Sequence, residues 1–167
     1  LGGKPTVPLV IRGPQGGGIR MAAQHSQSLE AWFTHVPGLV VVGPSTPHDA
    51  KGLLIAAIRE NNPVIFLENK LLYTAPPGPV PTEPYAIPIG VGKVRQPGTD
   101  VTVVATMSMV PRALAAARRM ANDGISVEVI DPRSLKPLDV ETLARSARKT
   151  RRLLVVEHSH YTASFGS

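Results

Sequence analysis

Cysteine is absent from the 167-residue sequence, which excludes disulfide bonds, thiolate metal sites and a cysteine nucleophile. Aromatic residues are few: one tryptophan, three tyrosines and three phenylalanines. No apolar run approaches the roughly 18 residues that span a bilayer, and no signal-peptide pattern opens the chain. We therefore expect no membrane insertion and a cytoplasmic location.

Acidic residues are outnumbered by basic ones, 12 against 18, and the resulting net charge of +6 raises the question of nucleic acid binding. The basic residues are dispersed except for one cluster, which consists of Arg145, Arg148, Lys149, Arg151 and Arg152. Lysine and arginine favour helix C-termini. We interpret the cluster as a solvated helix end that faces a partner, and we expect no nucleic acid ligand.

The composition, with 43% hydrophobic and 18% charged residues, is typical of a compact globular protein. The length suits one domain or parts of two. Because the sequence begins at Leu1 and stops just after a strand-like segment, we expect it to be incomplete at both ends.

The first half of the sequence predicts alternating strands and helices. Short apolar runs rich in β-branched residues predict buried strands at residues 7–11, 39–42 and 64–67. Apolar side chains at helical spacing predict a helix over residues 26–35. Thr46 can cap a second helix, with proline at its first position and an aspartate in its first turn. This half therefore has a β-α-β-α-β pattern.

The second half repeats that pattern. Strands are predicted at residues 101–105, 126–130 and 153–156. Helices are predicted at residues 110–122 and 139–149. Strands joined by crossover helices form parallel sheets. Both halves are therefore predicted to be α/β, each with helices covering a mainly parallel sheet.

The two halves are joined by a proline-rich stretch, residues 74–88. Its prolines are Pro76, Pro77, Pro79, Pro81, Pro84 and Pro88. Proline lacks the N–H group that a helix or a central strand requires, so the stretch favours an extended connection. We expect a domain boundary there.

Two segments of the first half are candidates for chemistry. Residues 12–18, RGPQGGG, follow the first strand, but they lack the P-loop ending and the dinucleotide glycine spacing, so a flexible turn is preferred to a phosphate site. His25 lies on the side of an α/β unit where ligands bind, and an imidazole can move protons near neutral pH. A lone histidine is also compatible with a purely structural role.

The remaining candidates are weaker. His158 and His160 follow the last strand without a further partner at metal-ligand spacing, so a structural or surface role is preferred, although a serine-histidine-acid triad stays open. The turn at Asn61 and Asn62 could offer oxygen atoms to a hard cation.

Read together, several segments resemble the beta chains of thiamine-diphosphate-dependent 2-oxo acid dehydrogenases, a branch of the transketolase-like family that is close to the acetoin dehydrogenases. The similarity covers nearly the whole chain, in matching order and spacing. The segments are VPLVIRGPQGGG, AAQHSQSLEAWFTHVPGLVVVGPSTPHDAKGLL, AAIRENNPVIFLENKLLY, YAIPIGVGK and VEVIDPRSLKPLD.

The resemblance implies two truncated transketolase-like domains. Residues 1–73 match the latter part of a pyrimidine-binding domain, residues 74–88 a linker, and residues 89–167 the first part of a transketolase C-terminal domain. The alpha chain of the family supplies the diphosphate and magnesium half of the site, so thiamine diphosphate with magnesium is shared between chains. The family also implies an α2β2 heterotetramer and a lipoyl-bearing acyltransferase partner.

The resemblance also assigns roles to individual residues. The histidine of AAQHSQ maps onto His25, which implies hydrogen bonding and proton transfer during acyl transfer to lipoamide. A structural potassium site, formed largely by backbone carbonyls, is implied at the following residues: Leu9, Ala57, Ile58, Glu60 and Asn62. Relatives commonly have aspartate at the position of Glu60.

Two family residues have no counterpart in this sequence. The glutamate that protonates the aminopyrimidine ring and the aromatic residue that stacks on that ring lie upstream of the matched region, and neither Glu30 nor Glu60 occupies the glutamate's motif. No cofactor-binding residue is therefore assigned, and the 167 residues alone are expected to be inactive.

Substrate choice stays open among pyruvate, branched-chain 2-oxo acids and acetoin, with pyruvate preferred. The alternatives are another transketolase-like enzyme and, from a different class, a non-catalytic α/β module that binds an acidic partner. The family implies a cytoplasmic location in a bacterium and the mitochondrial matrix in a eukaryote.

Overall fold

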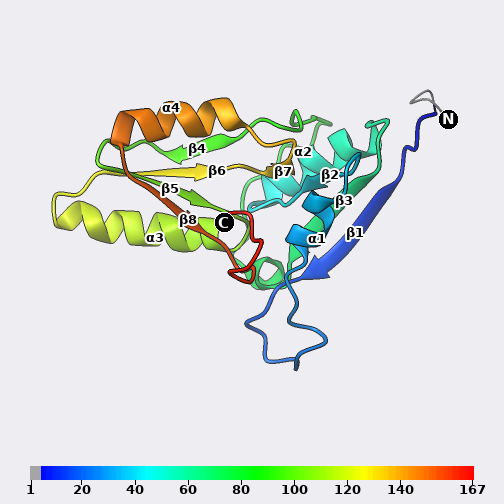
Figure 1. The fold of residues 1–167 in the computed structure, drawn as a ribbon, viewed down its shortest axis with the longest axis horizontal. Helices are drawn as coiled ribbons and strands as arrows, with labels where there is room; N and C mark the ends of the chain where they lie inside the picture. Colours follow the sequence, from blue (N-terminus) through cyan, green and yellow to red (C-terminus); the bar gives the residue numbers. More distant parts are fainter. Residues whose placement is uncertain (1–4) are drawn as a thin grey trace.

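The computed structural model describes residues 5–167 and folds them around two sheets (Figure 1). The strands are β1 (Val10–Gln15), β2 (Val40–Val42), β3 (Val64–Asn69), β4 (Lys93–Gln96), β5 (Val101–Ala105), β6 (Val127–Asp131), β7 (Ser134–Lys136) and β8 (Leu153–Val156). The helices are α1 (Glu30–His35), α2 (Pro47–Ile58), α3 (Met109–Asn122) and α4 (Val140–Thr150), with a short 3-10 helix, η1, at Lys70–Thr74.

Both sheets are four-stranded and mainly parallel. The first has the order β1-β3-β2-β7, in which only the β2–β7 pair is antiparallel. The second has the order β4-β6-β5-β8, in which only the β4–β6 pair is antiparallel. The predicted α/β class is confirmed.

Two elements are displaced from their expected positions. The strand expected at residues 7–11 is β1, Val10–Gln15, because the chain stays paired with β3 as far as the Gln15–Asn69 pair. The helix expected over 26–35 begins only at Glu30. Immediately before this start, the Gln15 side chain accepts a hydrogen bond from the N–H group of the N-cap residue Leu29 at 3.0 Å.

Two strands were not predicted. β4 is a short, largely polar edge strand without a clear alternating pattern. β7 has three residues and crosses from the second half of the chain to pair with β2, through Val41–Lys136 and Val42–Ser134. The chain after the linker therefore completes the first sheet, which links the two halves through backbone hydrogen bonds.

Helix boundaries follow local capping chemistry. Thr46 accepts a hydrogen bond from the Asp49 N–H group at 3.1 Å and caps α2, as predicted. Asp139 caps α4 by accepting from the Thr142 N–H group at 3.0 Å, and α4 ends where Arg151 adopts a left-handed conformation. These caps satisfy N–H groups that a helix leaves without partners.

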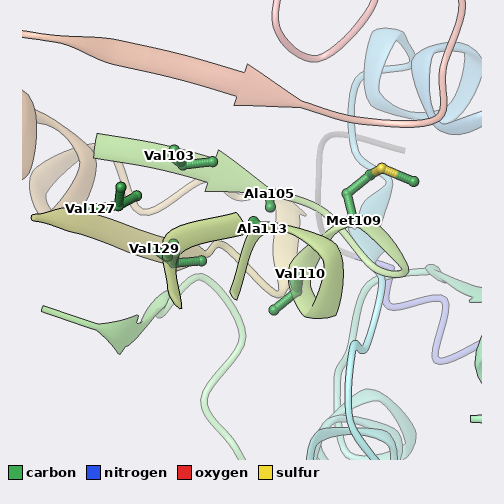
Figure 2. Close-up of a cluster of buried hydrophobic side chains, with 8 residues drawn as sticks. Val103, Ala105, Met109, Val110, Ala113, Val127 and Val129 are labelled. Atoms are coloured by element: carbon green, nitrogen blue, oxygen red, sulfur yellow. The ribbon is translucent and has the colours of Figure 1, made fainter. Parts of the chain in front are cut away.

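Separate apolar cores lie against each sheet. Figure 2 shows the core of the second sheet, where strand valines Val103, Val127 and Val129 lie beside Val110 and Ala113 of α3. The core of the first sheet joins β2, β3 and α2. Burial of such side chains is the main favourable term in folding.

A third core joins the two halves. Val41, Ile65 and Leu67 of the first sheet pack with Met107 and Leu135 from the second half, all at most 7% exposed. An apolar interface of this kind fixes the two sheets relative to each other. The carboxyl ends of strands from both sheets therefore meet at a defined junction.

The proline-rich stretch lies against α2. The Ile87 N–H group donates to the Gly52 carbonyl at 3.0 Å, and a Cβ on Gly52 would lie 2.6 Å from the Ile87 side chain. Lys51 donates to the carbonyls of Thr82 and Glu83 at 2.9 and 3.0 Å. Glycine at position 52 permits this close approach.

None of the helices within residues 5–167 is long and apolar enough to cross a bilayer.

Candidate functional site at the junction of the sheets

Four strands end at one junction and place polar side chains there. Gln15 and Asn69 are the last residues of β1 and β3, and both are almost fully buried. Met107 and His158 follow β5 and β8. The Gln15 Nε2 atom lies 3.8 Å from the Met107 sulfur, and the Asn69 Nδ2 atom lies 3.3 Å from His158 Nδ1. Open α/β sheets bind ligands at these carboxyl ends.

His25 lies on the loop of residues 16–29, which projects from the junction between β1 and α1 (Figure 1). Its side chain is exposed. Its backbone carbonyl accepts a hydrogen bond from the Lys70 ammonium group, which follows β3. Ser26 closes the turn by donating to the Ala22 carbonyl at 2.6 Å. His25 is therefore exposed to solvent, on a loop whose backbone carbonyls accept hydrogen bonds from Lys70 and Ser26.

The glycine-rich segment forms the entry to this loop. Gly16 has φ +92°, and a Cβ at this position would lie 2.5 Å from the Asn69 side chain. Its N–H group donates to the Gln27 carbonyl at 2.7 Å, which closes the base of the loop. Arg12 pairs with Glu68 of β3 at 2.6 Å. Gly16 therefore permits a sharp turn pressed against Asn69.

A buried carboxyl group lies beside the same loop. Glu30, only 1% exposed, accepts a hydrogen bond from Gln15 Nε2 at 2.9 Å, while its Oε1 atom has no hydrogen-bond partner in the described part of the chain. Burial raises the pKa of Glu30, and the nearby carboxylate of Glu157 adds to the rise. The neutral carboxyl form is thereby favoured.

The histidines after β8 have different surroundings. Burial lowers the pKa of His158, with the Arg112 charge contributing, so the neutral ring that contacts Asn69 is favoured. His160 lines a cavity of about 580 Å³ between α1 and the chain after β8, together with Trp32 and His35. His25 does not line this cavity.

A larger cavity of about 830 Å³ lies between the start of α2 and the segment from η1 to Pro79. Six of its 17 lining residues are prolines, and Leu72 and Tyr73 add further apolar surface. Arg95 and Glu68 supply charged groups, but each already pairs with opposite charges on the protein.

The residues predicted to hold potassium gather at the other end of the first sheet. The Leu9 carbonyl accepts from the Val64 N–H group at 2.8 Å, beside the last turn of α2, which contains Ala57 and Ile58. The Glu60 carboxylate turns back to accept from the Asn61 and Asn62 N–H groups at 3.0 and 3.2 Å. The residues predicted to bind potassium therefore lie at the start of β1 and β3, whereas His25 lies at the opposite end of these strands.

Sequence reasoning missed a buried ion network between the two halves. Arg95 of β4 pairs with Asp131 at 2.7 Å and also with Asp49 of α2. Arg133 lies 3.4 Å from the other oxygen of Asp49. Burial alone would raise the pKa of Asp49, but hydrogen bonding by Thr46 and the Arg95 charge hold it below its usual value. The sequence did contain a signal for this network, because Arg95 and Asp131 are charged residues at or near the ends of the strands β4 and β6.

The basic cluster at the end of α4 is partly neutralised within the chain. The Lys149 ammonium group pairs with the buried Glu128 carboxylate. Arg145 lies 3.7 Å from Glu141. Arg152 donates to the Asp100 backbone carbonyl at 3.3 Å, a contact that orients the side chain and leaves its charge in place. The two ion pairs leave less positive charge for a partner than the sequence suggests.

Two family models match consecutive parts of the chain. The model described as the transketolase pyrimidine binding domain matches residues 1–76, and the model described as the transketolase C-terminal domain matches residues 90–167. The chain belongs to the transketolase-like family.

Curated relatives of this transketolase-like chain confirm the likeness to dehydrogenase beta chains. It is 52% identical to acetoin:2,6-dichlorophenolindophenol oxidoreductase subunit beta of Cupriavidus necator, over 95% of this chain and 47% of that protein. It is 52% identical to pyruvate dehydrogenase E1 component subunit beta of Acholeplasma laidlawii, over 92% of this chain and 47% of that protein. The mitochondrial pyruvate dehydrogenase E1 component subunit beta of Bos taurus is 46% identical, over 93% of this chain and 44% of that protein.

A solved structure supports the same family. A split-gene transketolase, described as an inactive beta4 tetramer, is 28% identical and matches with a TM-score of 0.81 over 96% of this chain and 51% of that chain. The transketolase-like chain thus spans about half the length of the curated relatives it matches.

Proposed function

We propose that this chain is part of the beta subunit of a thiamine-diphosphate-dependent 2-oxo acid dehydrogenase, which decarboxylates pyruvate and passes the acyl group to lipoamide. The proposal is carried by the identity of 52% and 46% to two pyruvate dehydrogenase beta subunits, over 92% and 93% of the chain. The position of His25, exposed at the carboxyl ends of the strands, supports it.

The proposed partners follow from the family. They are an alpha chain, a second beta chain in an α2β2 heterotetramer, and a lipoyl-bearing acyltransferase. The proposed location is the cytoplasm of a bacterium, or the mitochondrial matrix if the source is a eukaryote. The proposed domain boundary at residues 74–88 divides the sequence, but it does not separate the two sheets. The strand β7 lies after the boundary and still pairs with β2 of the first sheet.

Thiamine diphosphate with magnesium, when bound, supplies the electron sink for decarboxylation. The carboxyl of Glu30 faces Gln15 and is fully buried, so it is not a cofactor contact. We assign cofactor binding to the alpha chain and to other parts of the beta chain. The contribution of this segment is His25, which accepts or donates a proton at an imidazole nitrogen while the acyl group moves to the lipoyl sulfur.

An acetoin-cleaving enzyme is the second candidate, because a pyruvate dehydrogenase subunit and an acetoin oxidoreductase subunit are each 52% identical to this chain. The test is to express the full reading frame with its alpha chain and to measure kcat/KM for pyruvate, branched-chain 2-oxo acids and acetoin with an artificial electron acceptor. We expect the highest value with pyruvate. A preference for acetoin selects the second candidate, and no turnover with any of them favours a non-catalytic module.

We further propose that the end of α2 and the turn after it bind a structural potassium ion through oxygen atoms. The implied ligands are Leu9, Ala57, Ile58, Glu60 and Asn62. Because the Glu60 carboxylate is engaged by the Asn61 and Asn62 N–H groups, the backbone carbonyl of Glu60 fits the ligand role better. A glutamate is then as suitable as an aspartate at this position.

Potassium is expected to raise the thermal unfolding midpoint of the full-length protein by about 2–4 °C relative to lithium. Both salts are compared at the same ionic strength, so that screening of surface charges is equal. Differential scanning fluorimetry measures the midpoints. Equal midpoints in the two salts would contradict the proposed site.

A further inference from the structure

The loop of residues 16–29 is held at its base and at one point along its length. Between its two ends the chain makes short-range turn contacts around Ala22, Ala23 and Ser26, and the Lys70 ammonium group donates to the His25 carbonyl. At the base, the Gly16 N–H group donates to the Gln27 carbonyl at 2.7 Å. The Lys70 bond holds the backbone of His25, while the path of the loop on either side of it depends on what fixes the base.

Gln15 supplies two bonds across that base. Its Oε1 atom accepts from the Leu29 N–H group at 3.0 Å, and its Nε2 atom donates to Glu30 Oε2 at 2.9 Å. The side chain is only 6% exposed. One amide thus ties the end of β1 to the first residues of α1, on both sides of the loop.

Glu30 is an unusual partner for this amide. Its side chain is 1% exposed, and its Oε1 atom makes no hydrogen bond to any described residue. A buried ionised carboxylate with an unpaired oxygen is costly, whereas a neutral carboxyl can still accept from Gln15 through Oε2. Burial, which raises the pKa of Glu30, therefore favours the neutral form in this contact.

The Gln15 side chain also contacts the second half of the chain. The Gln15 Nε2 atom lies 3.8 Å from the sulfur of Met107, which packs with Ile65 and Leu67 in the shared core. The base of the loop is thereby backed by an apolar interface that is fixed by packing.

We propose that Gln15 and Glu30 are positioning residues that hold the His25 loop in its working orientation. The inference rests on the proposed role of His25 in acyl transfer. Neither residue contacts a reacting group; both act through the loop. Their loss is expected to affect the step that needs His25 more than the step that does not.

The test uses Gln15→Met, which keeps the length of the side chain and removes both bonds, in the full-length protein assembled with its alpha chain. Hydrogen–deuterium exchange is expected to speed up roughly tenfold or more in residues 16–29, because one ordinary hydrogen bond changes an equilibrium constant by about that factor and the variant loses two. Exchange in α2 should not change. The kcat for lipoyl acylation is expected to fall by a similar factor, and decarboxylation to stay within about twofold.

Three further variants sharpen the test. Gln15→Leu removes both the acceptor for Leu29 and the donor to Glu30, and it should reproduce the effect if Gln15→Met does not fold. Glu30→Gln is neutral and of the same shape, and it should retain loop protection and acyl transfer. Gln24→Met replaces an exposed glutamine of the same loop and should match the unmodified protein.

Unchanged loop exchange in both Gln15 variants would overturn the inference, and so would an equal rise throughout α2, since that indicates general destabilisation. Faster loop exchange with acyl transfer intact supports the anchoring and counts instead against the proposed role of His25. The two failures are therefore distinguishable.

Discussion

Replacing His25 by alanine in the assembled enzyme is expected to lower lipoyl acylation by roughly 100-fold, within the range that a general acid or base contributes. Decarboxylation, followed with an artificial electron acceptor, should fall by less than about threefold, because proton transfer to the lipoyl group is not part of that assay. The two rates are measured on the same preparation. Their ratio is the diagnostic quantity.

The matched control is His35→Ala, since His35 is also exposed and lies at the far end of α1. It should leave both rates unchanged. The imidazole of His25 is exposed on its loop, so its removal creates no cavity and should leave the fold intact. Equal losses in acylation and decarboxylation would show that His25 has no specific part in acyl transfer.

Replacing Arg95 by methionine is expected to lower the free energy of unfolding by about 3–5 kcal/mol, the cost of leaving a buried charge without its partner. Asp131 is 0% exposed and Asp49 is 1% exposed, and Arg95 is bonded to both. Methionine has a similar length but no charge. Urea denaturation of the full-length protein, followed by circular dichroism, measures the change.

Arg12→Met is the control, because Arg12 is 54% exposed and its pair with Glu68 should contribute less than about 1 kcal/mol. In Arg95→Met the buried carboxylate of Asp131 loses the arginine that opposes the rise of its pKa in the folded state, whereas Asp49 keeps Arg133. The penalty at Asp131 is therefore present at high pH and is relieved as the pH falls and the carboxylate gains a proton. A loss below 1 kcal/mol, or one that grows on acidification, would contradict this account of the network.

The displaced start of α1 shows where local patterns fail. Apolar spacing predicts a helix from residue 26, yet the Gln15 side chain takes the Leu29 N–H group and the helix begins at Glu30. Hydrophobic periodicity reports which face a segment buries, and it carries no information on a bond from a residue 14 positions earlier. The burial of Glu30 was not predicted for the same reason, because its partner Gln15 lies 15 positions earlier in the sequence.

The candidate site was only partly predictable. His25 and the potassium set were assigned through likeness to a family, and their roles stay predictions. Asn69 and Met107 gave no motif, because their place at the junction depends on how two separate sheets meet.

By itself the sequence determined the α/β class, most of the strands and the start of α2, because β-branched runs and the Thr46 cap act between near neighbours. Only the tertiary structure decided that β7 joins the first sheet, that Asp49 meets Arg95 and that Gln15 meets Glu30. These contacts connect distant parts of the chain, and they form only when packing of the shared core brings the two sheets together.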